Sequence, residues 1–292
     1  MKRVMNKVAI QKEQTFEHET GHFKAADGTE LYFQCWQKPG NKQNKVLIFV
    51  HGMAEHSDRY RHVVQHFASK GYIVYAKDLR GHGKSKGHRA YAESMDQLVS
   101  DVQRFVRYVK GREKKKKFFL VGHSFGGQIV LNYTSHHPHD VDGVLVSSPN
   151  LRLKLPVNFI KRAMAPVLSR VFPKLALGND LDPALVSHDE DEVRNYERDP
   201  HILRKITAKL GDIVLENYLS VMDLAKKYKA PIFMMHAGDD LICCPTGTKE
   251  FFKKIPHKKK SLKIYKGLYH ELFNEVERHK VFRDMEAWLA KH

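Results

Sequence analysis

One serine set between glycines constrains this chain more than any other feature. The motif G-H-S-F-G occupies residues 122–126, with Ser124 at its centre. An apolar run at 118–121 precedes the motif and predicts a buried strand, whereas residues 127–133 predict a helix. So tight a strand-to-helix turn accepts only glycines on either side of the serine. The pattern therefore predicts that the Ser124 hydroxyl stands above a sheet, at a helix N-terminus whose amides favour negative charge.

This strand–turn–helix unit is typical of the nucleophile elbow of α/β-hydrolases. Apolar runs at 45–50, 72–76 and 143–146 predict further strands, and the apolar spacing in 95–110 predicts a helix with one face on a sheet. The expected fold class is therefore α/β, an α/β-hydrolase fold with a mostly parallel central sheet flanked by helices.

Two local predictions concern the first part of the chain. Residues 18–37 predict a hairpin whose turn contains Asp27 and Gly28. Ser57 is expected to cap a helix that extends to about residue 70.

A serine hydroxyl is a weak nucleophile, so it needs a base, and the base needs an orienting carboxylate. In this fold the acid and the histidine follow the serine in that order, each on a loop after a strand. The apolar run 231–237 leads to Asp239 and Asp240, and the run 261–265 leads to His270. We expect His270 to be the base and Asp240 the acid, because apolar residues directly after Asp240 can anchor the loop. Asp239 is the alternative.

An ester hydrolase also needs two backbone donors for the oxyanion. One is expected to be the amide of Phe125, directly after the nucleophile. The other is expected to be the amide of Met53, in the loop that follows the strand at 45–50.

Composition limits the class of protein. The 292 residues are 42% hydrophobic and 28% charged, which predicts a globular chain with one large core or a core plus an insertion. Three cysteines, two of them adjacent, indicate no disulfide framework and suit a reducing compartment. Residues 1–14 lack the apolar core of a signal peptide, and no run of about 18 apolar residues occurs. A cytoplasmic location is expected.

The net charge of +17 has three interpretations. Lysine runs at 114–117 and 258–260 are first of all solvated charge that aids solubility. Attraction to an anionic membrane surface is the second interpretation. Nucleic acid ranks last, because no helix-turn-helix, zinc finger or RNP-type motif is present.

The pattern changes between residues 150 and 229, where prolines separate short helical stretches and no clear strand occurs. We expect a helical cap (lid) insertion over 150–229, with the hydrolase core formed by 1–149 and 230–292. The basic and apolar stretch 151–177 fits either an amphipathic lid helix that touches lipid or a helix packed on the core. The histidines at 136, 137 and 139 are expected to be a solvated helix end rather than a metal site.

Several of these motifs closely resemble the monoacylglycerol lipase and lysophospholipase group of α/β-hydrolases. The resemblance covers nearly all of residues 16–292. It is carried by residues 51–60, 78–83 with Ser85, 122–127, 177–180, 196–200 and 263–271.

The resemblance implies roles for further residues. It assigns the acid to Asp240 and the oxyanion donors to Met53 and Phe125. It places Tyr196 near a head-group pocket and Cys243 near the site, although a small buried apolar role for Cys243 is the alternative. The positions expected to bind substrate are His51, Glu55, Arg59, His123 and Tyr196.

The expected function is that of a serine carboxylic-ester hydrolase that cleaves single-chain lipids, a monoacylglycerol lipase or lysophospholipase, through an acyl-enzyme intermediate. No metal or cofactor is expected. The alternatives are another serine hydrolase of this fold, such as an aminopeptidase, and a catalytically silent lipid-binding module.

Overall fold

A computed structural model describes residues 5–9, 15–40, 44–154, 159–179 and 181–292. Within these ranges a nine-stranded sheet has the order β1-β2-β3-β5-β4-β6-β7-β10-β11. The strands β1, β2 and β3 are antiparallel, and the six from β5 to β11 are parallel to one another. The bounds are β1 Met5–Ala9, β2 Thr15–Lys24, β3 Glu30–Gln37, β4 Lys45–Val50, β5 Ile73–Lys77, β6 Lys117–His123, β7 Gly143–Ser147, β10 Ile232–Ala237 and β11 Lys260–Tyr265.

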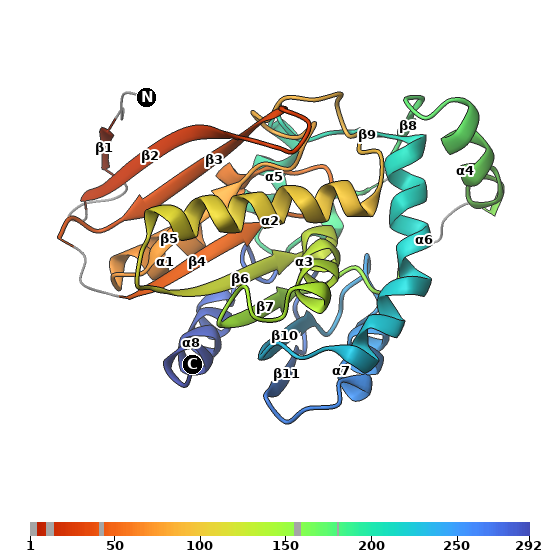
Figure 1. Cartoon of the computed structure of the whole chain (residues 1–292). Helices are drawn as coiled ribbons and strands as arrows, with labels where there is room; N and C mark the ends of the chain where they lie inside the picture. The colour runs from red at the N-terminus through yellow and green to blue at the C-terminus, as the bar shows by residue number, and fades with distance from the viewer. Residues whose placement is uncertain (1–4, 10–14, 41–43, 155–158, 180) are drawn as a thin grey trace.

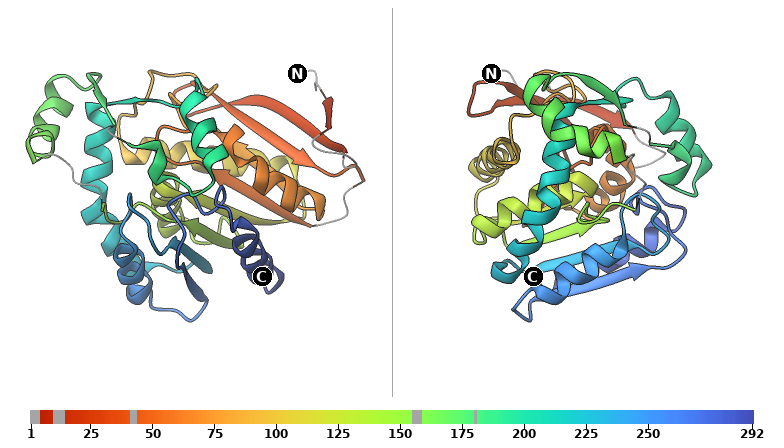
Figure 2. Two further views of the ribbon diagram at one scale, coloured as in Figure 1. Left: turned by 180° about the vertical axis from the view of Figure 1, so that it is seen from behind. Right: turned by 90° about the vertical axis from the view of Figure 1, so that its right-hand side faces the viewer.

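Helices cover both faces of this sheet. Because side chains alternate along a strand, Val46 and Ile48 of β4 pack toward α2 and α3, whereas Leu47 and Phe49 pack toward α1 and α8. Figure 1 shows α2 and α3 in front of the sheet, and the view from behind in Figure 2 brings α1 and α8 forward. The helices are α1 Arg61–Ser69, α2 Met95–Arg112, α3 Ser124–His136, α7 Pro245–Lys254 and α8 Arg278–Ala290. The α/β-hydrolase fold expected from the sequence is confirmed.

The hairpin between residues 18 and 37 is also confirmed, as β2 and β3. The prediction for Ser57 is wrong. A short 3-10 helix, η1 Ser57–Tyr60, precedes α1, and no side chain caps it. Ser57 instead donates its amide to Asp78 and accepts a hydrogen bond from Gln34, so it joins two loops rather than capping a helix.

The segment between β7 and β10 is mostly helical, but it also contains a pair of strands where the sequence showed no clear strand pattern. Leu177 and Ile206 pair in a two-stranded antiparallel sheet, β8 Ala176–Gly178 with β9 Lys205–Thr207. Strands of three residues leave no periodicity that a sequence reading can detect. The helices here are α4 Phe159–Val171, η2 Pro183–Leu185, α5 Glu190–Arg198, α6 Ala208–Leu224 and η3 Ala225–Lys227. Helix α4 lies against α6 at the periphery of the molecule (Figure 1).

Two earlier predictions fall partly outside the described residues. Of the basic segment 1–14, only 5–9 is described, and it forms β1. Of the amphipathic stretch 151–177, residues 155–158 lie outside the described ranges.

A buried lysine at the end of β5 yields a stability prediction. The Lys77 side chain is fully buried, and its Nζ has no hydrogen-bond partner among the described residues. Burial lowers the pKa of Lys77 to about 8 from 10.5, despite the nearby Asp101 carboxylate. Lys77→Met is expected to raise the free energy of unfolding by about 2–3 kcal/mol at pH 7, measured by urea denaturation.

The pH dependence checks this cause. Between about pH 8 and 10.5, Lys77 is protonated in the unfolded state but has lost its proton in the folded state. The free energy of unfolding of the native chain therefore rises with pH across this range. The advantage of Lys77→Met over the native chain should therefore shrink across that window. Lys86→Met, at an exposed position, is the control and should change stability little. A Lys77→Met variant less stable than the native chain would contradict the argument.

Candidate active site

The elbow at the end of β6 holds Ser124 in a strained backbone conformation. Ser124 has φ +51°, in the left-handed region that residues with a side chain rarely adopt. A Cβ on Gly122 would lie 2.7 Å from the carbonyl oxygen of Gly126, and one on Gly126 would lie 2.3 Å from the carbonyl oxygen of His51. The two glycines therefore let α3 begin directly against β4 and β6, which sets Ser124 at the carboxyl ends of the parallel strands.

Three side chains from different loops form one hydrogen-bonded chain. The Ser124 Oγ lies 2.9 Å from Nε2 of His270, and Nδ1 of His270 lies 2.7 Å from Oδ2 of Asp240. The second oxygen of Asp240 accepts the amides of Ile242 and Cys243, each at 2.8 Å. Asp240 is fully buried, whereas Asp239 is exposed and does not contact the histidine. The structure thus brings Asp240, and not Asp239, to His270.

A second histidine, which the sequence reading missed, also faces the acid. The Nε2 of His236, in β10, lies 3.2 Å from Oδ2 of Asp240. Burial raises the pKa of Asp240, but His270 and His236 overcome this, and the pKa lies well below its ordinary value. Asp240 therefore remains a carboxylate, the form that orients and stabilises a protonated imidazole.

The electrostatics of His270 set a pH prediction. Burial lowers the pKa of His270, but the Asp240 carboxylate more than offsets this, and the pKa lies above its ordinary value of 6.5. Only the neutral imidazole can accept the serine proton, so activity falls as the pH drops through this pKa. The acid limb of kcat/KM for an uncharged ester is expected above about pH 6.5, measured from pH 5 to 9. An acid limb well below pH 6 would contradict it.

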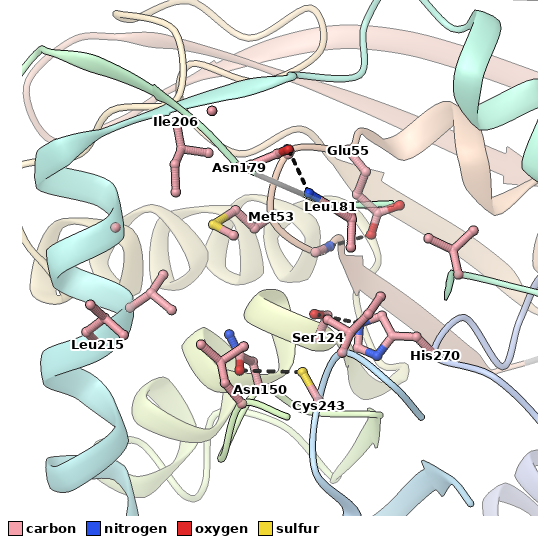
Figure 3. A pocket seen from close by; sticks show the side chains of 18 of the residues that line it. Met53, Glu55, Ser124, Asn150, Asn179, Leu181, Ile206, Leu215, Cys243 and His270 are labelled. Atoms are coloured by element: carbon pink, nitrogen blue, oxygen red, sulfur yellow. Dashed lines mark hydrogen bonds between the residues drawn. The ribbon is translucent and has the colours of Figure 1, made fainter. Parts of the chain in front are cut away.

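The two expected oxyanion donors have amides free for a ligand. Phe125 is the second residue of α3, so its amide has no acceptor within the helix. Glu55 accepts the Gly52 amide at 2.5 Å, which folds the loop back and leaves the Met53 amide without a hydrogen bond to any described residue. Met53 lines the cavity in front of Ser124, as Figure 3 shows.

The Ser124 hydroxyl opens into a cavity of about 340 Å³, mostly apolar, between the sheet and the segment 150–229. Its polar groups include Glu55, Glu271 and Tyr196. Its apolar lining includes Leu153, Ala165, Leu177, Leu181, Val186, Ile206, Val214, Leu215 and Ile242. An apolar cavity with a few convergent polar groups is the usual form of a small-molecule site.

A buried ion pair joins the loops on either side of the nucleophile. Arg59 donates two hydrogen bonds to Glu271, at 2.5 and 2.7 Å, and lies 3.4 Å from Glu55. Burial raises the pKa of Glu271, but the Arg59 guanidinium lowers it by more, and the pKa falls to about 2. This carboxylate therefore stays charged. The bidentate pair holds the loop of His270 against the loop of Met53.

The structure separates the five residues expected to bind substrate. Glu55, His123 and Tyr196 line the cavity, but the side chains of His51 and Arg59 do not. The prediction for those two is corrected: the His51 ring accepts the amide of Leu79 at 2.8 Å and supports the loop from behind.

Arg59, in turn, lies 4.6 Å from the centre of the Tyr196 ring and is screened from the cavity by it. Glu271 was missed as a cavity residue. Its position directly after His270 was the available signal.

No group of three or more histidine, cysteine, aspartate or glutamate side chains in the described ranges could hold a metal ion. His136 and His137 turn to different partners, Asn132 and Gln103. Of the helices in the described part of the chain, none is long and apolar enough to cross a bilayer.

Comparison with known proteins places this geometry in a family. A family model described as serine aminopeptidase, S33, matches residues 41–277. A monoacylglycerol lipase from Mycolicibacterium smegmatis is 31% identical over 92% of this chain and 96% of its own length. The human monoglyceride lipase is 32% identical over 92% of this chain and 90% of its own length.

The chain is also 32% identical to an uncharacterized abhydrolase domain-containing protein from Dictyostelium discoideum. That match covers 91% of this chain but only 28% of the longer Dictyostelium protein. Among solved structures, the monoacylglycerol lipase of Paleococcus ferrophilus superposes with a TM-score of 0.81 at 34% identity. That alignment covers 90% of this chain and 99% of the other.

Proposed function

This chain belongs to the α/β-hydrolase family described as serine aminopeptidase, S33, and is a serine hydrolase; from that premise we propose that it cleaves the acyl ester of single-chain lipids. Monoacylglycerols are the proposed first substrate class and lysophospholipids the second. The observation that carries the proposal is the Ser124–His270–Asp240 chain at the floor of a mostly apolar cavity. The lipase names of relatives more than 30% identical support it.

The proposed reaction uses each group at a stated atom. The Ser124 Oγ attacks the ester carbonyl while Nε2 of His270 takes its proton, and the Asp240 carboxylate stabilises the charged ring. The Met53 and Phe125 amides hold the oxyanion, and each such donor contributes about 3 kcal/mol to lowering the barrier. The alcohol leaves with the proton from His270. Nε2 of His270 then takes a proton from water, whose oxygen attacks the acyl-enzyme carbonyl. The same proton returns to the Ser124 Oγ as the fatty acid leaves.

The family description makes an aminopeptidase the second candidate. The carboxylates in the cavity disfavour this candidate, because both already have partners within the protein. A site for a free N-terminal ammonium needs an uncommitted carboxylate. Glu271 is already paired with Arg59 through two hydrogen bonds, and Glu55 accepts the Gly52 amide and the Tyr60 hydroxyl. An ester with an uncharged alcohol fits these groups better.

A substrate panel tests the proposal. The purified chain is given monooleoylglycerol, lysophosphatidylcholine and an aminoacyl p-nitroanilide, and kcat/KM is measured for each. The highest value is expected for monooleoylglycerol, and the lowest for the anilide. Preferential cleavage of the anilide would replace the proposal with a peptidase. Absence of labelling by a fluorophosphonate probe, together with no hydrolysis, would instead indicate a silent binding module.

We also propose that residues 150–229 act as a cap over a core formed by 1–149 and 230–292, and that this cap meets an anionic membrane surface. Met164, Val167 and Val171 are 43%, 54% and 58% exposed and recur on one face of α4. Phe172, 61% exposed, extends this apolar face. The same helix contributes Ala165 to the cavity lining, so the apolar face lies beside the site.

Vesicle sedimentation tests this contact. Val171→Asp with Phe172→Asp is expected to lower binding to vesicles of phosphatidylcholine with phosphatidylglycerol by at least about 10-fold, since each buried apolar side chain stabilises by roughly 1.5–3 kcal/mol. Val276→Asp, at a position 52% exposed in the loop before α8, is the control and should bind as the native chain does. Equal loss in both variants would contradict the proposal.

A further inference from the structure

A buried asparagine interrupts the apolar wall of the cavity. Asn150 is only 4% exposed, yet it lines the cavity together with leucines and valines. A buried amide is costly unless its polar atoms have partners. The proposed reaction uses none of the Asn150 side-chain atoms, so its polar atoms are expected to have other partners.

One end of this amide is fully occupied by the protein. The Asn150 Oδ1 accepts the Tyr218 hydroxyl of α6 at 2.7 Å and lies 3.5 Å from the thiol of Cys243. The backbone amide of Asn150 donates to the carbonyl oxygen of Ser124 at 3.0 Å. The side chain is therefore held rigidly between the nucleophile, the acid loop and the cap helix.

The other end is free and faces the ligand space. The Asn150 Nδ2 makes no hydrogen bond to any residue within the described ranges. Figure 3 shows this nitrogen directed into the cavity, on the Leu215 side of Ser124 and away from Glu55. Val214 and Leu215 line the same wall, one helical turn before Tyr218. An acyl chain along this apolar wall would pass the free N–H.

The position of Asn150 limits which part of the acyl chain it can meet. Its backbone is bonded to Ser124, and its side chain touches Cys243, whose thiol contacts the Ser124 side chain. The free nitrogen is thus close to the nucleophile rather than at the far end of the cavity. An oxygen carried near the ester carbonyl is within its range, and one at the end of a long chain is not.

We infer that Asn150 is a specificity-determining residue, whose Nδ2 donates a hydrogen bond to an oxygen substituent near the carbonyl of the acyl group. The inference rests on the proposed ester hydrolysis and adds a preference for acyl groups such as 3-hydroxy acids. A site built to hydrogen-bond a substrate group discriminates against the analogue that lacks it, because its own polar group is left unpaired.

The test compares three p-nitrophenyl esters, of decanoic, 3-hydroxydecanoic and 10-hydroxydecanoic acid. The native chain is expected to cleave the 3-hydroxy ester with a kcat/KM about 10-fold above that of the 10-hydroxy ester, the effect of one neutral hydrogen bond in a desolvated site. Asn150→Leu should reduce this ratio to about 1, because the near-isosteric side chain has no donor. A native ratio near 1, or a ratio unchanged in Asn150→Leu, overturns the inference.

Two further variants keep the test decisive. Val214→Ala changes the same wall without a polar atom, and its ratio should remain that of the native chain. Tyr218→Phe removes the hydrogen bond that holds Oδ1, so the Asn150 amide can turn and its free N–H is no longer fixed toward the ligand. The ratio should therefore fall while the fold is kept, even if Asn150→Leu does not fold. A ratio lost equally in Val214→Ala would assign the preference to cavity shape and overturn the inference. If the chain cleaves the decanoate ester but shows no preference for the 3-hydroxy ester, only the role inferred for Asn150 is refuted. If it cleaves none of the three esters, the proposed function is refuted.

Discussion

Ser124→Ala is expected to lower kcat/KM for p-nitrophenyl decanoate by about 10⁴-fold or more, because the hydroxyl is the only nucleophile aligned with His270 among the described residues. The residual rate comes from the oxyanion donors and from substrate binding. Alanine keeps the Cβ that serine already carries at φ +51°, so the thermal unfolding midpoint should change little.

Two companion variants sharpen this result. Ser135→Ala lies near the end of the same helix, where the hydroxyl only donates to the Leu131 carbonyl, and it should keep its activity. Ser124→Gly removes the Cβ from a left-handed backbone conformation, so it should lose activity while the unfolding midpoint rises. Turnover by Ser124→Ala at the native rate would refute the assignment of the nucleophile.

Asp240→Asn is expected to lower kcat by about 10⁴-fold with the fold intact, the effect of losing the carboxylate that holds a catalytic imidazole in its productive form. The amide oxygen can still accept the Ile242 and Cys243 amides, so the loop is retained. Loss of the carboxylate also removes the main influence that raises the pKa of His270. The acid limb of the residual activity should therefore move to lower pH.

Asp239→Asn is the matched control for this variant. Asp239 is the neighbouring residue, is exposed, and does not contact His270. Its substitution should change kcat/KM by no more than about 2-fold, as is usual at an exposed position. If Asp239→Asn lost activity and Asp240→Asn retained it, the Ser124–His270–Asp240 hydrogen bonds seen in the structure would not be those used in catalysis.

Local patterns predicted much of this site. The glycines around Ser124, the acid loop after β10 and the histidine loop after β11 each follow an apolar run, and parallel strands bring their carboxyl ends to one edge of a sheet. Order along the chain was therefore enough to name Ser124, His270 and the pair Asp239 and Asp240. Within that pair, the apolar residues that follow Asp240 already favoured it over Asp239. The hydrogen bond from Asp240 to His270 is seen only in the structure, because periodicity does not tell which of two adjacent loop residues is buried.

The partners that support the site lie too far apart in sequence for local patterns to pair them. Arg59 and Glu271 are separated by 212 residues, and Asn150 and Tyr218 by 68. Each residue is an ordinary polar side chain in its own segment. Its function as one half of a buried pair depends on which surfaces the cap and the loops present to each other after folding.

The amino-acid sequence alone thus determines an α/β-hydrolase with a serine at a strand-to-helix elbow, because glycine placement and apolar periodicity act through the local backbone. Tertiary packing alone decided two further features: His51 and Arg59 stand behind the cavity, and the Asn150 amide faces into it. The reason is physical. A side chain's burial and hydrogen-bond partners are set by distant segments, which contribute nothing to the pattern of residues around it.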